Sequence, residues 1–284
     1  MANLKEIRNR IASVSSTMQI TSAMKMVSAA KLKKAQDAIT AMRPYANKLT
    51  ELLQNLSATL DADSGSKYSE QRDIKNVLIV AITSNRGLCG AFNSNIIKQA
   101  NVVAEGYDAN VSVVAIGKKA NDALSKNFDI ISNQSAVYDD LTFDNVAVIA
   151  EMLMEQFESK AVDKIEIIYN KFKNAATQEI MTEQFLPIEP IEGDANANLD
   201  YIFEPSKEEI VETLIPKSLK TQLYKSIRDS FASEHGARMT AMHKATDNAT
   251  ELRDQLKLTY NKARQASITN EILEIVGGAE ALNG

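Results

Sequence analysis

The sequence predicts an α/β protein whose two long terminal helices pair as an antiparallel coiled coil, with a parallel-sheet domain between them. Residues 1–60 contain no glycine and one proline, and their apolar residues recur every three or four positions. Residues 206–276 show the same spacing. The segment between them alternates β-branched runs with helical stretches. We therefore expect an N-terminal coiled-coil helix (1–60), a central α/β domain (61–205) and a C-terminal coiled-coil helix (206–284).

The N-terminal helix carries an apolar stripe with a mean spacing of about 3.5 residues, as in the seam of a coiled coil. The stripe runs through Leu4, Ile7, Ile11, Val14 and Met18, and again through Ala35, Ile39, Met42, Ala46, Leu49, Leu53, Leu56 and Leu60. Between these parts we expect a register shift through Ile20, Met24 and Val27. We also expect a kink at Pro44. At about 1.5 Å per residue the helix spans about 90 Å, so it needs a second long element as partner.

The C-terminal helix is predicted to be that partner. Ser206 is a suitable N-cap and is followed by an acidic first turn. One face of the helix carries Leu219, Leu223, Ile227, Phe231, Met239, Met242, Ala249, Leu252, Leu256, Ile268, Ile272, Ile275 and Val276. We expect a kink at Pro216 and the end of the helix at Gly277-Gly278.

The middle of the chain predicts a mostly parallel, Rossmann-like sheet. Buried-strand patterns occupy 77–83 and 111–116, and residues 164–169 and 179–186 can pair with each other. Helical stretches lie near 91–105, 118–127 and 143–160. Such alternation places helices on the faces of a parallel sheet. Residues 61–69 and 187–205 are predicted to be a linker and a loop.

The charge distribution is uneven and restricts the possible partners. Residues 1–60 have a net charge of +6, residues 61–205 of −11, and residues 206–284 of zero. The basic end suggests a partner with local negative charge, although a solvated helix face is an equal alternative. Nucleic acid is disfavoured, because the whole chain is acidic and no aromatic residue interrupts the basic stretch. The single cysteine, Cys89, excludes an internal disulfide and favours a reducing compartment.

The sequence contains no recognisable catalytic, cofactor-binding or metal-binding set of residues. The segment 83–90 (TSNRGLCG) follows a strand and opens a helix, where ligands commonly bind, but it matches no phosphate-binding motif. We favour a tight structural turn there. Cys89 is better explained as a buried small residue than as a nucleophile. His235 and His243 lie two helical turns apart, too far for one metal, and we expect both on the helix surface.

Five stretches together carry a resemblance to a known family. They are 4–14 (LKEIRNRIASV), 19–31 (QITSAMKMVSAAK), 83–90, 233–242 (SEHGARMTAM) and 260–279 (YNKARQASITNEILEIVGGA). Together they resemble the gamma subunit of rotary F-type ATP synthases, in order, from Leu4 to Leu282. Asn85 departs from the usual Asp, and the paired cysteines of the chloroplast regulatory insert are absent.

The resemblance implies a mechanical role rather than catalysis. It implies a central-stalk rotor of a proton-translocating ATP synthase that couples rotation of the c-ring to ATP synthesis or hydrolysis in the hexamer of alpha and beta subunits. The expected partners are the alpha and beta subunits, the epsilon subunit and the c-ring, with no cofactor and no nucleic acid. The expected location is the cytoplasmic face of a bacterial inner membrane, as a peripheral part of the complex, with a processed organellar chain as the alternative.

The resemblance also implies roles for individual residues. Contact with the beta subunits falls to Lys25, Lys31, Lys33, Lys34, Arg264, Gln265 and Thr269. The apolar tip that turns in the upper bearing is formed by Ile268, Ile272 and Ile275. The foot near the c-ring and epsilon includes Tyr201, Phe203 and Glu204.

Two other functions fit the residues without the resemblance. One is an α/β enzyme that binds a nucleotide at the 83–90 turn and dimerises through its helical arms. The other is a coiled-coil scaffold that binds one fixed partner without rotating. The proteins captured with the chain would distinguish all three.

Overall fold

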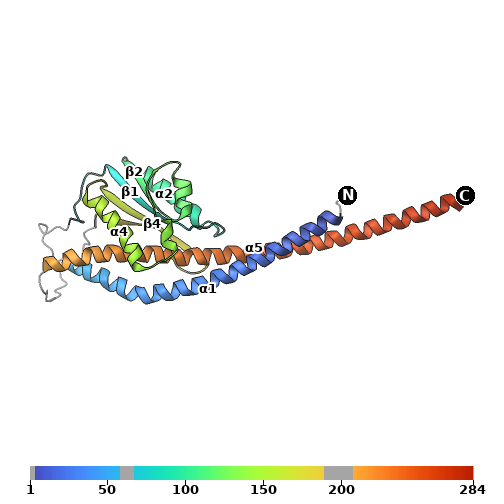
Figure 1. The fold of residues 1–284 in the computed structure, drawn as a ribbon, viewed down its shortest axis with the longest axis horizontal. Coiled ribbons are helices and arrows are strands. Elements are labelled where there is room, and N and C mark those ends of the chain that lie inside the picture. The colour runs from blue at the N-terminus through green and yellow to red at the C-terminus, as the bar shows by residue number, and fades with distance from the viewer. Residues whose placement is uncertain (1–3, 58–66, 189–206, 284) are drawn as a thin grey trace. The chain divides into compact units, whose positions relative to one another are not determined.

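The computed structural model describes residues 4–57, 67–188 and 207–283 (Figure 1). The chain divides into two compact units, one of residues 1–28 and 239–284 and the other of residues 29–238. Two long helices contribute to both units: α1 (Leu4–Ser57) and α5 (Lys207–Asn283). We call the first the tip unit and the second the domain unit, and we describe each by itself.

The domain unit contains a five-stranded sheet. Its strands are β1 (Asn76–Ile82), β2 (Asn110–Ile116), β3 (Asp129–Asn133), β4 (Lys164–Phe172) and β5 (Gln178–Leu186). The order is β3-β2-β1-β4-β5, and only β5 pairs antiparallel with its neighbour. The predicted parallel sheet is therefore confirmed. The short edge strand β3 was not predicted, because only two of its five residues are apolar and only two are partly buried.

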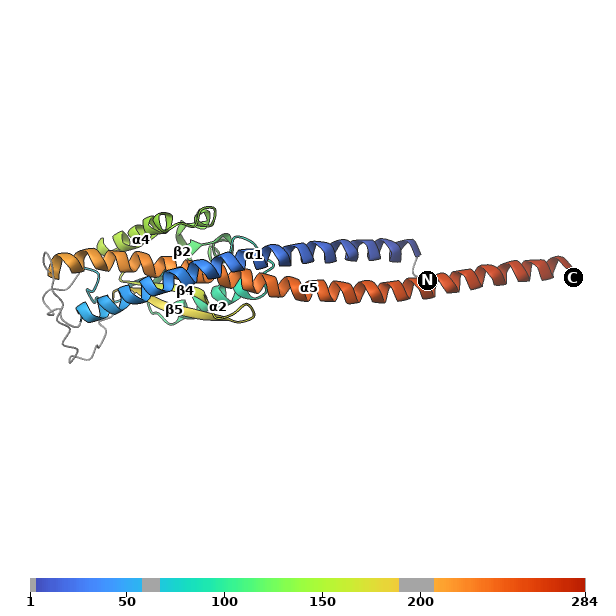
Figure 2. The ribbon, with the colours of Figure 1, turned by 90° about the horizontal axis from the view of Figure 1, so that it is seen from below.

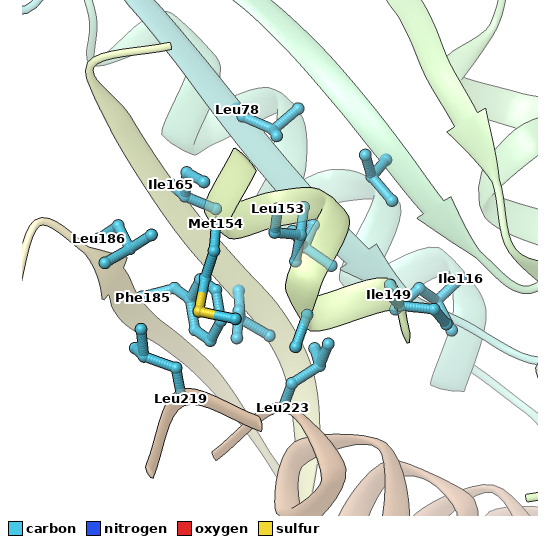
Figure 3. Close-up of a cluster of buried hydrophobic side chains, with 14 of the residues drawn as sticks. Leu78, Ile116, Ile149, Leu153, Met154, Ile165, Phe185, Leu186, Leu219 and Leu223 are labelled. Atoms are coloured by element: carbon cyan, nitrogen blue, oxygen red, sulfur yellow. The ribbon is translucent and has the colours of Figure 1, made fainter. Parts of the chain in front are cut away.

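Each face of the sheet is covered by helices. Helices α2 (Phe92–Glu105) and α3 (Lys118–Leu124) pack on one face, where alternate residues of β1 such as Ile79 and Ala81 are buried. The other face takes α4 (Phe143–Glu158) and the first part of α5. Figure 3 shows how Leu153 and Met154 of α4 gather with Phe185 and Leu219 in this second core. The sheet is thus doubly wound, since its crossovers lie on both faces.

In the domain unit, α1 runs along α5 (Figure 2). The buried residues of this part of α1 keep the predicted spacing, at Leu32, Ala35, Ile39, Ala46 and Leu49. The ammonium group of Lys217 lies over the Tyr45 ring, 5.9 Å from its centroid. Pro44 and Pro216, where we expect kinks, lie inside helices that continue past them.

In the tip unit, α1 and α5 pair in antiparallel fashion. Arg8 Nη2 donates a hydrogen bond of 2.9 Å to the Tyr260 hydroxyl, and the Thr246 hydroxyl donates one of 2.8 Å to Thr21 Oγ1. As the residue number rises in α1, the partner's number falls in α5. The pairing of the terminal helices that the sequence predicted is confirmed.

Two details of the predicted helices are wrong. The seam does not shift register: the alternating three- and four-residue spacing continues from Met18 through Thr21 and Ser28, which are buried, while Ile20 and Val27 are each 57% exposed. The prediction was based on which side chains are apolar. The buried positions instead keep the seven-residue spacing even where their side chains are small and polar. Helix α5 also continues through Gly277-Gly278 to Asn283, because exposed glycines weaken a helix without ending it. The predicted cap Ser206 lies outside the described residues.

Candidate functional site

The turn that follows β1, residues 83–90, lies where a doubly wound sheet commonly binds its ligand. The chain winds from β1 through β2 to β3 on one side, whereas β4 lies on the other side of β1. The carboxyl end of β1 is therefore at the switch point of the sheet. What fills this position decides between a ligand site and a structural turn.

Backbone and side-chain groups of the turn form hydrogen bonds within the domain unit. Ser84 donates its backbone N–H to Asn93 Oδ1 at 2.9 Å. Asn85 accepts the backbone N–H of Lys118 at 2.9 Å and donates its amide to the Ser135 carbonyl at 3.0 Å. Leu88 has a left-handed φ of 64°. These contacts support the interpretation of 83–90 as a structural turn.

Helix α5 reaches the turn through one arginine. Arg238 Nη2 donates to the carbonyl oxygens of Arg86 and Gly87, at 3.0 and 3.2 Å. Its Nη1 lies 2.5 Å from Glu234 Oε1, one turn earlier on the same helix. Both side chains are about nine-tenths buried, and burial raises the pKa of Glu234 although Arg238 opposes the rise. We call these two residues the Glu234–Arg238 pair.

This geometry does not suit a phosphate. An anion needs backbone N–H groups and cations that point toward it. Here two carbonyl oxygens of the turn face α5, and the guanidinium of Arg238 is already shared between them and Glu234. The 83–90 turn is therefore a poor site for the nucleotide that the enzyme hypothesis requires.

Cys89, which is part of the turn, is buried as predicted, with 1% of its surface exposed. Asn93 donates its side-chain amide to Cys89 Sγ at 3.2 Å. Burial raises the pKa of the Cys89 thiol, so the thiol stays protonated. A protonated, buried thiol is a poor nucleophile, which agrees with its predicted structural role.

The two histidines have different surroundings. His243 is exposed as predicted, with Nδ1 at 3.3 Å from Lys25 Nζ and 3.4 Å from Asp247 Oδ2. The prediction for His235 was wrong, because only 4% of its surface is exposed. Its ring and that of Phe231 are nearly perpendicular, with centroids 4.5 Å apart. Burial, aided by the charges of Arg238 and Lys31, lowers the pKa of His235 to about 3. Its helical position gave no sign of burial, since α5 is packed on nearly all sides from Ser226 to Arg238.

The basic residues predicted to contact beta subunits lie along α1. Lys25 is half-buried beside His243 in the tip unit. Lys31, Lys33 and Lys34 are exposed in the domain unit, and Lys33 forms an ion pair of 3.2 Å with Asp37 one turn later. An exposed pair of this kind is weak and leaves these side chains available to a partner.

The predicted contact residues of α5 lie in the last part of the tip unit. Arg264, Gln265 and Thr269 are exposed, and the Thr269 hydroxyl donates to the Gln265 carbonyl at 2.9 Å. The predicted bearing residues are exposed as well: Ile268 by 45%, Ile272 by 55% and Ile275 by 71%. The predicted foot residues Tyr201, Phe203 and Glu204 lie outside the described residues.

Within the described part of the chain, the structure offers neither a metal site nor a membrane-spanning helix. No group of three or more His, Cys, Asp or Glu side chains gathers in residues 4–57, 67–188 and 207–283. None of the helices over the same ranges is long and apolar enough to cross a bilayer.

Comparisons with known proteins agree on one family. A family model described as ATP synthase matches residues 3–282. The ATP synthase gamma chains of Flavobacterium psychrophilum and Flavobacterium johnsoniae are 77% and 74% identical, over the whole of both chains in each case. The central stalk and c-ring structure of the Tetrahymena thermophila mitochondrial ATP synthase contains a chain with 27% identity and a TM-score of 0.60, covering 80% of this chain and 99% of that one. A rotor chain of the Euglena gracilis mitochondrial ATP synthase has the same fold, with 23% identity, a TM-score of 0.65 and 93% and 98% coverage.

Proposed function

The chain belongs to the ATP synthase gamma chain family, and we propose that it works by turning inside the hexamer of alpha and beta subunits. A gamma chain is a non-catalytic, central-stalk subunit of the complex. Its contribution is mechanical, because its position relative to the catalytic subunits sets their conformations. The proposed driving force is proton flow, which turns the c-ring and the central stalk with it.

One observation carries the proposal: in the tip unit, α5 ends in an exposed apolar stripe. Arg8, near the start of α1, pairs with Tyr260, and α5 continues from there to Asn283. Beyond the pairing, the stripe is formed by Ile268, Ile272, Ile275 and Val276, all at least 45% exposed. Apolar residues in such a row mark a surface that a partner covers. A sleeve of surrounding subunits would cover it while the helix turns.

The partners we propose are the alpha and beta subunits, the epsilon subunit and the c-ring. The Tetrahymena structure joins a central stalk with a c-ring, which supports contact between this chain and a membrane-embedded ring. Contact with beta subunits is proposed for the basic residues of α1 and for Arg264, Gln265 and Thr269, all described above. Tyr201, Phe203 and Glu204 are proposed for the foot. Charge attraction at exposed lysines is screened by salt, so steric contact should carry most of the torque.

Two further assignments belong to this proposal. The complex is membrane-associated, and we place the chain on the cytoplasmic face of a bacterial inner membrane, as its similarity to Flavobacterium chains supports. We also propose that residues 1–60, 61–205 and 206–284 act as helix, foot domain and helix.

The test is a truncation in the assembled complex. A chain that ends after Gln265 lacks the apolar stripe, and we expect it to lower both complex yield and ATP-driven proton pumping. A chain that ends after Val276 keeps the stripe and serves as the matched control, with pumping close to that of the full chain. Normal rotation, yield and pumping after removal of residues 266–284 would contradict the role proposed for the tip.

A further inference from the structure

The Glu234–Arg238 pair joins the 83–90 turn of the α/β fold to α5, about two to three helical turns beyond Ile227, a residue of α5 that lies in the apolar core. That core includes Leu219, Leu223 and Ile227 of α5. From Ser230 onward, the buried positions of α5 are occupied mainly by small or polar residues, and Gly236 lies against the Ala175 backbone. Apolar packing is non-directional. Directional contacts therefore add a specific resistance to sliding in this region.

We propose that Arg238 is a positioning residue that locks the 83–90 turn to α5, so that the α/β domain and this part of α5 rotate as one body. The inference rests on the proposed rotor function and adds an internal link through which torque passes. The bonds from Asn93, Lys118 and Ser135 hold the turn within the α/β fold. The two bonds from Arg238 hold it to the helix.

The chemistry of the pair suits this task. A guanidinium is planar, carries five N–H donors and stays charged, so one side chain can serve a carboxylate and two carbonyls at once. Lysine offers a single nitrogen and cannot reproduce this arrangement. Glu234 orients the guanidinium, and Lys31 and Arg86 add positive charge near the Glu234 carboxylate. The pair is buried, so its attraction is screened less by salt than that of an exposed pair.

The conformation of the 83–90 turn needs contacts from outside the turn to maintain it. Leu88 has a φ of 64° and Gly90 a φ of 61°, and the Leu88 side chain is exposed. A leucine in the left-handed region is strained, and its surroundings must maintain that conformation. Loss of the Arg238 bonds should let residues 84–90 relax and move relative to α5.

The experiment compares R238K and E234Q in the assembled, membrane-bound complex. The control is R253K, since Arg253 lies in the tip unit and pairs with its neighbour Asp254. Two quantities are measured: amide hydrogen exchange of residues 84–90, and protons pumped per ATP hydrolysed. For R238K we expect at least tenfold faster exchange in the turn and at least a twofold loss in the pumping ratio, with ATP hydrolysis retained. E234Q keeps an acceptor oxygen and should show a smaller change in the same direction.

Each outcome supports or overturns the inference. Unchanged exchange in R238K would show that the arginine does not hold the turn. Faster exchange with an unchanged pumping ratio would show that the turn plays no part in coupling. If R238K fails to assemble, E234Q decides on the same two measurements. Should the unaltered chain and R253K also fail to support pumping, the proposed rotor function would fail instead of the link.

Discussion

The Thr246 hydroxyl donates a hydrogen bond to Thr21 Oγ1, which in turn donates to the Met18 carbonyl, so a polar contact crosses the seam of the coiled coil. Lys25 and His243 meet one turn away, at 3.3 Å. Polar residues inside a seam reduce stability but specify register, because a slipped pairing would leave them without partners.

Replacing both threonines by valine should therefore stabilise the pairing of α1 and α5. T21V alone removes one partner, and we expect a loss of about 1 kcal/mol. The double variant T21V/T246V replaces both with apolar groups of similar shape and should be more stable than either single variant. Thermal unfolding of the purified chain, followed by circular dichroism, measures the difference. A double variant whose loss equals the sum of the two single losses would show that the hydroxyls do not interact.

Gly117 should tolerate no side chain. Its φ is +108°, and an added Cβ would lie 2.2 Å from the Thr83 carbonyl oxygen. We expect G117A to lower the free energy of unfolding by about 2–4 kcal/mol. The control is G277A, which meets nothing within 4 Å in α5 and should be stabilising by about 0.5–1 kcal/mol. Denaturant titration of both variants provides the measurement, and equal stabilities would contradict the argument.

His235 should make the protein less stable as the pH falls below neutrality. Its pKa is about 3 in the folded chain and near 6.5 when unfolded, so between these values the unfolded chain binds the extra proton. Stability is complete above about pH 6.5 and is lost progressively toward pH 3. From pH 7 to pH 5 we expect a loss of about 1–2 kcal/mol, partly opposed by the raised pKa of Glu234.

Unfolding titrations at several pH values test this expectation. The slope of stability against pH should flatten in H235Q and stay as it is in H243Q, whose site is exposed. The slope is compared because a substitution that lowers the free energy of unfolding equally at every pH leaves the slope unchanged. A slope in H235Q equal to that of the unaltered chain would assign the effect to other groups.

Neutralising the exposed lysines of α1 should weaken coupling without abolishing it. Exposed ion pairs contribute about 0.2–1 kcal/mol, so the triple variant K31Q/K33Q/K34Q should lower coupled ATP synthesis about two- to fivefold at low salt. The difference should shrink at high salt. Lys98 and Lys126 are exposed on the α/β domain, and K98Q/K126Q is the matched control. ATP synthesis in membrane vesicles, measured at two salt concentrations, would reveal a loss that is independent of salt if steric contact alone were changed.

The elements of this fold could be predicted where one physical pattern dominates. Strand β1 is buried on both faces and reads as a continuous apolar run, and β2 and β4 are apolar at most positions. The pairing of α1 with α5 follows from the seven-residue spacing of apolar residues. The seam could not be followed through Thr21 and Ser28, because small polar residues satisfy the spacing while leaving no apolar signal. Attention to spacing rather than to side-chain type would have found it.

The buried surroundings of His235 and Arg238 could not be predicted for a different reason. Helix periodicity describes one buried face, whereas this part of α5 is enclosed by α1, the sheet domain and the 83–90 turn together. Such enclosure depends on contacts between segments about 150 residues apart, as for Arg238 and Gly87, which local patterns do not report. The candidate partner contacts on α1 and α5 stay predictions, since they concern surfaces that other subunits would cover.

The antiparallel pairing in the tip unit places a constraint on biosynthesis. Arg8 and Tyr260 are separated by 252 residues, so the first turns of α1 leave the ribosome long before their partner exists. At about 5–20 residues per second, the delay lasts roughly 10–50 seconds. During this time Ile7, which is buried in the finished protein, has no segment of α5 to cover it. A nascent chain of this design therefore leaves the apolar stripe of the first part of α1 uncovered until most of α5 has been translated.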